Sequence, residues 1–100
     1  MTLGQLAAAE QVRPPTMTRL VSALEADGLV LRETDTRDRR QVWITATPAG
    51  RAVLAKGRTR RVEALAESLR GLPPDDVSAL EDAVGILERV VRGAATADDS

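Results

Sequence analysis

Residues 13–40 read RPPTMTRLVSALEADGLVLRETDTRDRR, a stretch that combines the signals for a helix with those for a hairpin. Pro14 suits the first turn of a helix, where a backbone amide would have had no partner. Apolar residues then recur at the spacing of one helical face, which is formed by Met17, Leu20, Val21 and Leu24. Gly28 favours the left-handed conformation that ends a helix. The sequence therefore predicts a helix that starts near Pro14 and ends at Gly28.

The opposite side of this helix carries small, polar and cationic side chains, which are Pro15, Thr18, Arg19 and Ser22. Two segments rich in β-favouring residues follow at 29–34 and 41–45. The charged, turn-like run from Asp35 to Arg40 separates them. This pattern predicts a two-stranded hairpin with a basic tip.

Further helices are expected on both sides of this unit. Thr2 and Gln5 match a capping box, so a helix should run from Leu3 to about Gln11 before the prolines interrupt it. Thr47 is a suitable N-cap for another helix, with Pro48 at its first position. We expect that helix to continue to about Arg70, before Gly71 and the prolines at 73 and 74.

A last helix is expected to start at Asp75 and Asp76, whose charges suit the helix dipole, and to end before Gly93. Residues 94–100 are small and acidic, which predicts a disordered tail. Within the helix, apolar residues alternate at spacings of three and four, typical of a face that packs against another helix. We interpret five of them as a dimer interface: Val77, Leu80, Val84, Leu87 and Val91.

The composition of the chain excludes several kinds of chemistry. It contains no cysteine, histidine, tyrosine or phenylalanine, so disulfides, thiolate nucleophiles and the commonest general base are all absent. Acidic pairs such as Asp75 with Asp76 are explained by their place at a helix start. We predict a protein that is not an enzyme and needs no cofactor or metal. No apolar run is long enough to span a bilayer, and a reducing cytoplasm is the simplest compartment.

The charges are divided between two parts of the sequence. Residues 13–61 contain eleven basic and five acidic residues, a net charge of +6. Residues 62–100 contain three basic and nine acidic residues, a net charge of −6. The first part of the chain is therefore expected to present a surface for a polyanion.

Double-stranded DNA fits this combination of elements. A helix enters the major groove, where arginine and threonine side chains read base edges, and its N-terminal amides can hold a phosphate. A hairpin tip with arginines reaches the flanking backbone or the minor groove. We predict a DNA-binding surface formed by Arg13, Pro15, Thr16, Thr18, Arg19, Ser22, Arg37, Asp38, Arg39 and Arg40.

The predicted fold class is α+β and mostly helical, a winged helix-turn-helix with two long C-terminal dimerisation helices. Residues 1–47 would form the winged helix-turn-helix region and residues 48–93 the helical dimerisation region.

Several short motifs resemble the multiple-antibiotic-resistance regulator (MarR) family. They include the run from Thr16 to Val21, the stretch Asp27-Gly28-Leu29-Val30, the D-x-x-D-R-R pattern ending at Arg40, and the T-x-x-G-R start at Thr47. The similarity extends from residue 2 to about residue 93.

This resemblance implies a homodimeric winged-helix regulator on a pseudopalindromic operator, often a repressor that a small phenolic or aromatic effector relieves. It also implies that Thr16, Thr18 and Arg19 lie in the major groove. Arg40 would enter the minor groove, with Asp38 orienting its side chain. Family members normally carry about two helices before the point that matches the start of this chain. Leu6, Leu20 and Leu24 would then have to be covered in another way, and we therefore predict tighter or altered dimerisation through the five residues of the last helix.

Alternative interpretations remain open from the sequence. The chain could be a helical protein-interaction module that has lost DNA binding. The charged residues of the hairpin tip could form only a surface salt-bridge cluster. Trp43 could pack under the hairpin or line a ligand pocket. Lys56, Arg58, Arg60 and Arg61 could form a solvated helix face rather than contact phosphates.

Overall fold

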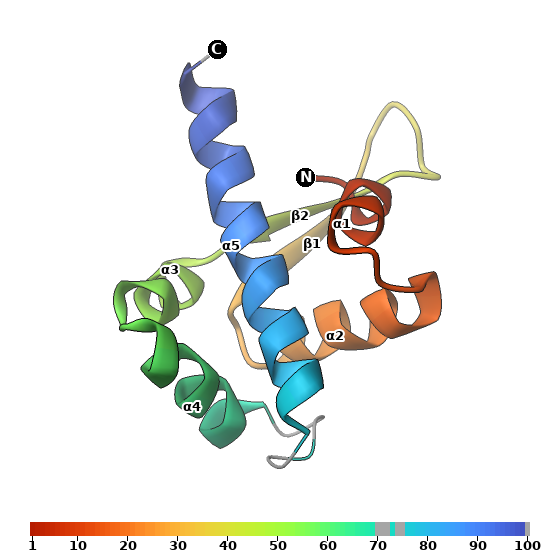
Figure 1. Ribbon diagram of the computed structural model, residues 1–100. Helices are drawn as coiled ribbons and strands as arrows, with labels where there is room; N and C mark the ends of the chain where they lie inside the picture. Colours follow the sequence, from red (N-terminus) through yellow and green to blue (C-terminus); the bar gives the residue numbers. More distant parts are fainter. Residues whose placement is uncertain (70–72, 74–75, 100) are drawn as a thin grey trace.

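The computed structural model describes residues 1–69, 73 and 76–99. The elements are α1 (Leu3–Glu10), α2 (Pro14–Ala26), β1 (Val30–Thr34), β2 (Val42–Ala46), α3 (Pro48–Ala55), α4 (Arg58–Ser68) and α5 (Val77–Asp99). The hairpin and α1 lie at one side of α5, and α3 and α4 lie at the other (Figure 1). The predicted α+β winged helix-turn-helix is confirmed.

Local signals in the sequence set the first two helices. Thr2 caps α1, because its hydroxyl accepts a hydrogen bond from the amide of Gln5 while the Gln5 side chain accepts one from the amide of Thr2. Gln11 ends the helix in the left-handed conformation, at φ 56°. Pro14 then begins α2, and Gly28 follows its end at φ 75°. The predicted positions of both helices are confirmed to within two residues.

The hairpin is antiparallel, and its register pairs Val30 with Ala46 and Thr34 with Val42. The first residues of the chain add to the free side of β2. The amide of Ile44 donates to the carbonyl of Met1 at 2.7 Å, and Thr2 forms an isolated bridge with Trp43. The helix-turn-helix unit is thereby fixed to the base of the hairpin.

Helix α5 provides the cover that Leu6, Leu20 and Leu24 need. It packs against α1, α2, α3, α4 and β2, and these three leucines are completely buried in one continuous core. On α5, Leu80 and Leu87 lie in the same core. Burying a leucine side chain contributes roughly 1.5–3 kcal/mol. A helix from the C-terminal part of the chain thus completes the helix-turn-helix core.

This packing explains the apolar repeat that we interpreted as a dimer interface. Leu80 and Leu87 are buried within the chain itself, and Val84 is 9% exposed. Of the five residues only Val77 is largely exposed, at 50%, and Val91 is half-buried. In this conformation the repeat packs on other helices of the same chain, so Leu80, Val84 and Leu87 are not available to a partner.

The prediction of one helix from Pro48 to about Arg70 is wrong, because the chain breaks it at Lys56 and Gly57, both in extended conformation. Arg61 stabilises this break. Its guanidinium donates to the carbonyl of Lys56 at 3.0 Å and to that of Leu54 at 2.7 Å, two carbonyls at the end of α3. α4 ends at Ser68, and Arg70 and Gly71 lie outside the described residues.

The last helix also differs from the prediction. Asp76 caps it, since its carboxylate accepts from the amide of Ala79 at 3.1 Å, whereas Asp75 lies outside the described residues. The helix does not stop before Gly93 but continues to Asp99, where we predicted a disordered tail. Residues 94–99 include three alanines, the residue with the highest helix propensity.

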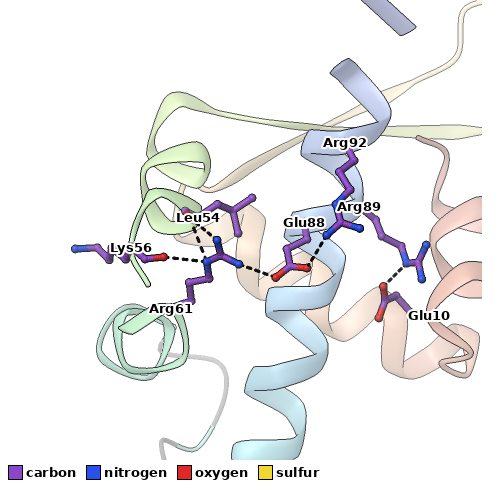
Figure 2. Close-up of polar contacts among 7 residues, drawn as sticks. All are labelled: Glu10, Leu54, Lys56, Arg61, Glu88, Arg89 and Arg92. Carbon is purple, nitrogen blue, oxygen red and sulfur yellow. Dashed lines mark hydrogen bonds and ion pairs between the residues drawn. The ribbon is translucent and has the colours of Figure 1, made fainter. Parts of the chain in front are cut away.

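Ion pairs attach α5 to the helices on both of its sides (Figure 2). Arg61 of α4 donates to the carboxylate of Glu88 at 2.9 Å, and Arg92 lies 3.5 Å from the same carboxylate. On the other side of α5, Arg89 pairs with Glu10 of α1. These contacts fix α5 across the helix-turn-helix unit.

Candidate nucleic-acid interface

Helix α2 is amphipathic. Its buried side is formed by Met17, Leu20, Val21 and Leu24. The residues predicted to face DNA lie on the other side, where Pro15, Thr18, Arg19 and Ser22 are exposed and Thr16 is half-buried. Arg13, at the N-cap, is exposed as well. The side chains that we expected to read base edges are therefore accessible.

The first turn of α2 offers fewer amide donors than we expected. Arg13 makes no side-chain capping bond, and Pro14 and Pro15 follow it at the first two helical positions. Proline has no N–H, so two of the amides that hold phosphates at helix N-termini are missing here. The end of α2 that could hold a phosphate thus has few free amides, and Arg13 is the exposed cation beside it.

Arg32 of β1 connects the hairpin to α2. Its Nη2 donates to the Ser22 hydroxyl at 3.0 Å, and its Nε lies 3.8 Å from the Glu25 carboxylate. Ser22 is thus already engaged within the chain, where we predicted a DNA contact. Arg32 fixes the exposed side of α2 relative to the first strand.

The loop between the strands, residues 35–41, is the wing. Asp38 holds Arg40 there: the amide and Nε of Arg40 donate to one carboxylate oxygen at 3.1 and 3.0 Å, and Nη2 approaches the other at 3.4 Å. The Arg40 side chain is nevertheless 91% exposed. Arg37 and Arg39 are exposed as well. The wing therefore presents three arginines to solvent, one of them oriented by Asp38.

A hollow of about 350 Å³ joins the wing to the start of α2. Pro14 and Thr18 of α2 line it together with Arg40 of the wing. Its remaining walls are mostly apolar and include Leu3, Ala7, Met17 and Val42. In Figure 1 the wing and the first turn of α2 reach the same side of the molecule. One face thus combines the exposed residues of both elements.

The family comparison agrees with this architecture, because the family model of MarR matches residues 1–42, from the start of α1 to the beginning of β2. The first part of the chain is therefore similar to the MarR family. Its similar curated relatives include HTH-type transcriptional regulators of Mycobacterium tuberculosis, Mycobacterium bovis and Mycobacterium leprae, each 36% identical over 91 residues. The last two are named as uncharacterized.

The aligned region covers 91% of this chain and 64% of each relative. The chain therefore spans less than two thirds of the length of these curated relatives. No solved structure matches it significantly.

Two residues of the hairpin, Asp35 in the wing and Trp43 in β2, were not predicted as site residues from sequence. The Asp35 carboxylate accepts hydrogen bonds from the wing backbone, and the indole Nε1 of Trp43 donates to the same carboxylate at 2.8 Å. Trp43 is 39% exposed. The D-x-x-D spacing of Asp35 and Asp38 could have indicated the role of Asp35, because aspartate side chains in turns often accept hydrogen bonds from amides two or three residues later. The tryptophan gives no comparable local signal.

The remaining cations of the first half lie elsewhere. Lys56 and Arg60 are exposed around the α3–α4 turn, which Figure 1 places on the side away from the wing. Arg61 binds the end of α3 and Glu88 instead of solvent.

Among the described residues, no helix is long and apolar enough to cross a membrane, and no cluster of acidic residues could hold a metal ion.

Proposed function

We propose that this protein is a transcription regulator that binds double-stranded DNA through α2 and the wing. The observation that carries the proposal is the meeting of Thr18 from α2 and Arg40 from the wing at one hollow, each with an exposed side chain. One element that fits the major groove and one that fits the minor groove therefore lie next to each other.

In this proposal α2 lies in the major groove with Thr16, Thr18 and Arg19 at the base edges. Arg13 contacts the phosphate backbone at the start of the helix, where prolines replace amide donors. Arg40 enters the adjacent minor groove, whose negative potential favours guanidinium groups. Arg37 and Arg39 contact the flanking phosphates.

We further propose that the regulator acts in the cytoplasm as a homodimer on a pseudopalindromic operator, where its binding would repress transcription. Two copies of α2 would then occupy half-sites about one helical turn apart. In the conformation described here, Val77 and Val91 are the residues of the predicted interface that remain accessible to a partner. Sedimentation of the free protein at micromolar concentration tests the dimer, and a monomer would overturn it.

A small aromatic acid is the effector that we propose. The hollow between α1, α2 and the wing supports this, because its apolar walls suit an aromatic ring and Arg40 suits a carboxylate. A ligand there would cover Thr18 and Arg40, so it would compete with DNA. Benzoate should therefore weaken binding to duplex DNA, and it should bind less tightly to Arg40→Met than to the original protein.

Selection from a random duplex library, followed by titration of the enriched duplex at several salt concentrations, tests the main proposal. We expect a palindromic consensus and an affinity that falls linearly with salt on logarithmic axes, since each neutralised phosphate releases counterions. An interaction module without DNA binding would enrich no sequence. That result would overturn the proposal.

A further inference from the structure

The Asp35 carboxylate collects three hydrogen bonds at the base of the wing. One oxygen accepts from the amide of Arg37 at 2.7 Å and from that of Asp38 at 3.2 Å. The other accepts from the indole Nε1 of Trp43 at 2.8 Å. Asp35 follows directly after β1, whereas Trp43 lies in β2. A single carboxylate therefore joins the start of the loop to the strand that leaves it.

The backbone contributes two more bonds to this loop. The amide of Asp35 donates to the carbonyl of Gln41 at 3.0 Å, and the amide of Gln41 donates to the carbonyl of Asp38 at 2.9 Å. Residues 36–40 belong to neither strand. Since ladder bonds do not fix these residues, side-chain bonds from Asp35 and Asp38 determine much of the conformation of the loop.

We propose that Asp35 and Trp43 form a clamp that positions the wing for DNA, holding residues 36–40 in the conformation that presents Arg40. This inference rests on the proposed DNA binding. Neither residue needs to touch DNA. The Arg40 side chain is almost fully exposed, so packing does not hold it in place. Without the clamp, residues 36–40 would have to become ordered when DNA binds, and the entropy lost in that step would lower the affinity.

A role for Asp35 through its charge alone and a role in positioning predict opposite effects on DNA affinity when Asp35 is replaced. Asp35 is an anion beside a surface for phosphates, so removing its charge should strengthen DNA binding if charge were its only role. If Asp35 is a positioning residue, Asp35→Ala should weaken binding by about tenfold, the order of one lost arginine contact. The control is Glu33→Ala, which removes an exposed carboxylate from β1 in the same hairpin. Binding by that variant should be unchanged or stronger.

A double-substitution cycle separates positioning from general damage to the fold. In an Arg40→Ala background the clamp no longer presents Arg40, so adding Asp35→Ala should weaken binding little further. Asp35→Asn keeps an oxygen for the backbone amides and should recover part of the affinity. Equal losses from Asp35→Ala in both backgrounds, or stronger binding by Asp35→Ala alone, would overturn the clamp.

A measurement without DNA tests the clamp itself. Trp43 is the only tryptophan of the chain, so its indole N–H gives a single signal in nuclear magnetic resonance spectra. We expect Asp35→Ala to speed hydrogen exchange of this N–H several-fold, while Glu63→Ala, at an exposed position of α4, leaves it unchanged. Unchanged exchange in Asp35→Ala would overturn the clamp. If the original protein enriches no duplex, the proposed function fails instead, whatever the exchange rates are.

Discussion

Arg32 in β1 donates a hydrogen bond to the hydroxyl of Ser22 in α2 at 3.0 Å, and this contact links the first strand of the hairpin to α2. The same guanidinium lies 3.8 Å from Glu25. Arg32 therefore adds a polar contact to the apolar core that sets the relative position of the two proposed DNA-contacting elements. Arg32 was not among the residues predicted to form the site.

Arg32→Met should lower both stability and DNA affinity. It removes the bond to Ser22 while keeping much of the apolar stem, and one such hydrogen bond contributes about 1 kcal/mol. Urea unfolding measures the first effect and titration of the enriched duplex the second. Adding Arg32→Met to Ser22→Ala should cost less than in the original chain, and fully additive costs would contradict the contact.

Gly50→Ala should destabilise the fold by about 1–3 kcal/mol. A Cβ at this position would overlap the backbone carbonyl of Leu29 and lie 3.1 Å from Leu87 Cδ1, and a backbone oxygen cannot move away easily. This explains the glycine in the T-x-x-G-R start of α3. Gly4→Ala is the control, since a Cβ at Gly4 meets nothing within 4 Å. It should stabilise α1 by roughly 0.5–1 kcal/mol, and similar melting temperatures for the two variants would contradict this account.

Arg61→Met should destabilise the protein far more than Arg60→Met. Arg61 satisfies carbonyls at the end of α3 and pairs with Glu88, with a side chain only 23% exposed. Bonds of a charged donor contribute about 1.5–3 kcal/mol, whereas changes at an exposed position such as Arg60 stay within about 0.5 kcal/mol. Chemical denaturation of the two variants provides the comparison. Equal midpoints would show that Arg61 does not hold the α3–α4 break.

Acid should release the wing only at a pH below the ordinary pKa of an aspartate side chain. The indole of Trp43, followed by the amides of Arg37 and Asp38, lowers the pKa of Asp35, because all three donate to the charged form. The contribution of these bonds is thus complete above the pKa of an unfolded aspartate and is lost as pH falls through the lower, folded value. The Asp35 carboxyl shift in nuclear magnetic resonance should titrate below the ordinary pKa of an unfolded aspartate. A midpoint at or above that value would contradict the three bonds.

Local signals predicted the elements that carry the site. The capping box at Thr2, the proline at Pro14 and the glycine at Gly28 each act within a few residues, so α1, α2 and the hairpin follow from the sequence. The exposed side of α2 follows from its apolar period.

Features that depend on distant contacts were not predicted. Arg61 stabilises the break at Gly57, and Arg61 is itself held by Glu88, which lies 27 residues after Arg61 in the chain. The apolar repeat of α5 shows that the helix packs, but not that it packs on this chain's own α1 and α2. The side-chain donor to Asp35, the indole of Trp43, lies eight residues further along the chain on the opposite strand.

The central claim is that α2 and the wing form one DNA-binding face, and fluorescence anisotropy with the enriched duplex over a range of salt concentrations tests it most directly. Arg19→Ala and Arg40→Ala should each weaken binding by about tenfold or more and make its dependence on salt less steep. Arg60→Ala removes the same charge from the side away from the wing and should change affinity little. Equal losses from all three substitutions would mean that net charge alone drives binding, and that result would contradict the account.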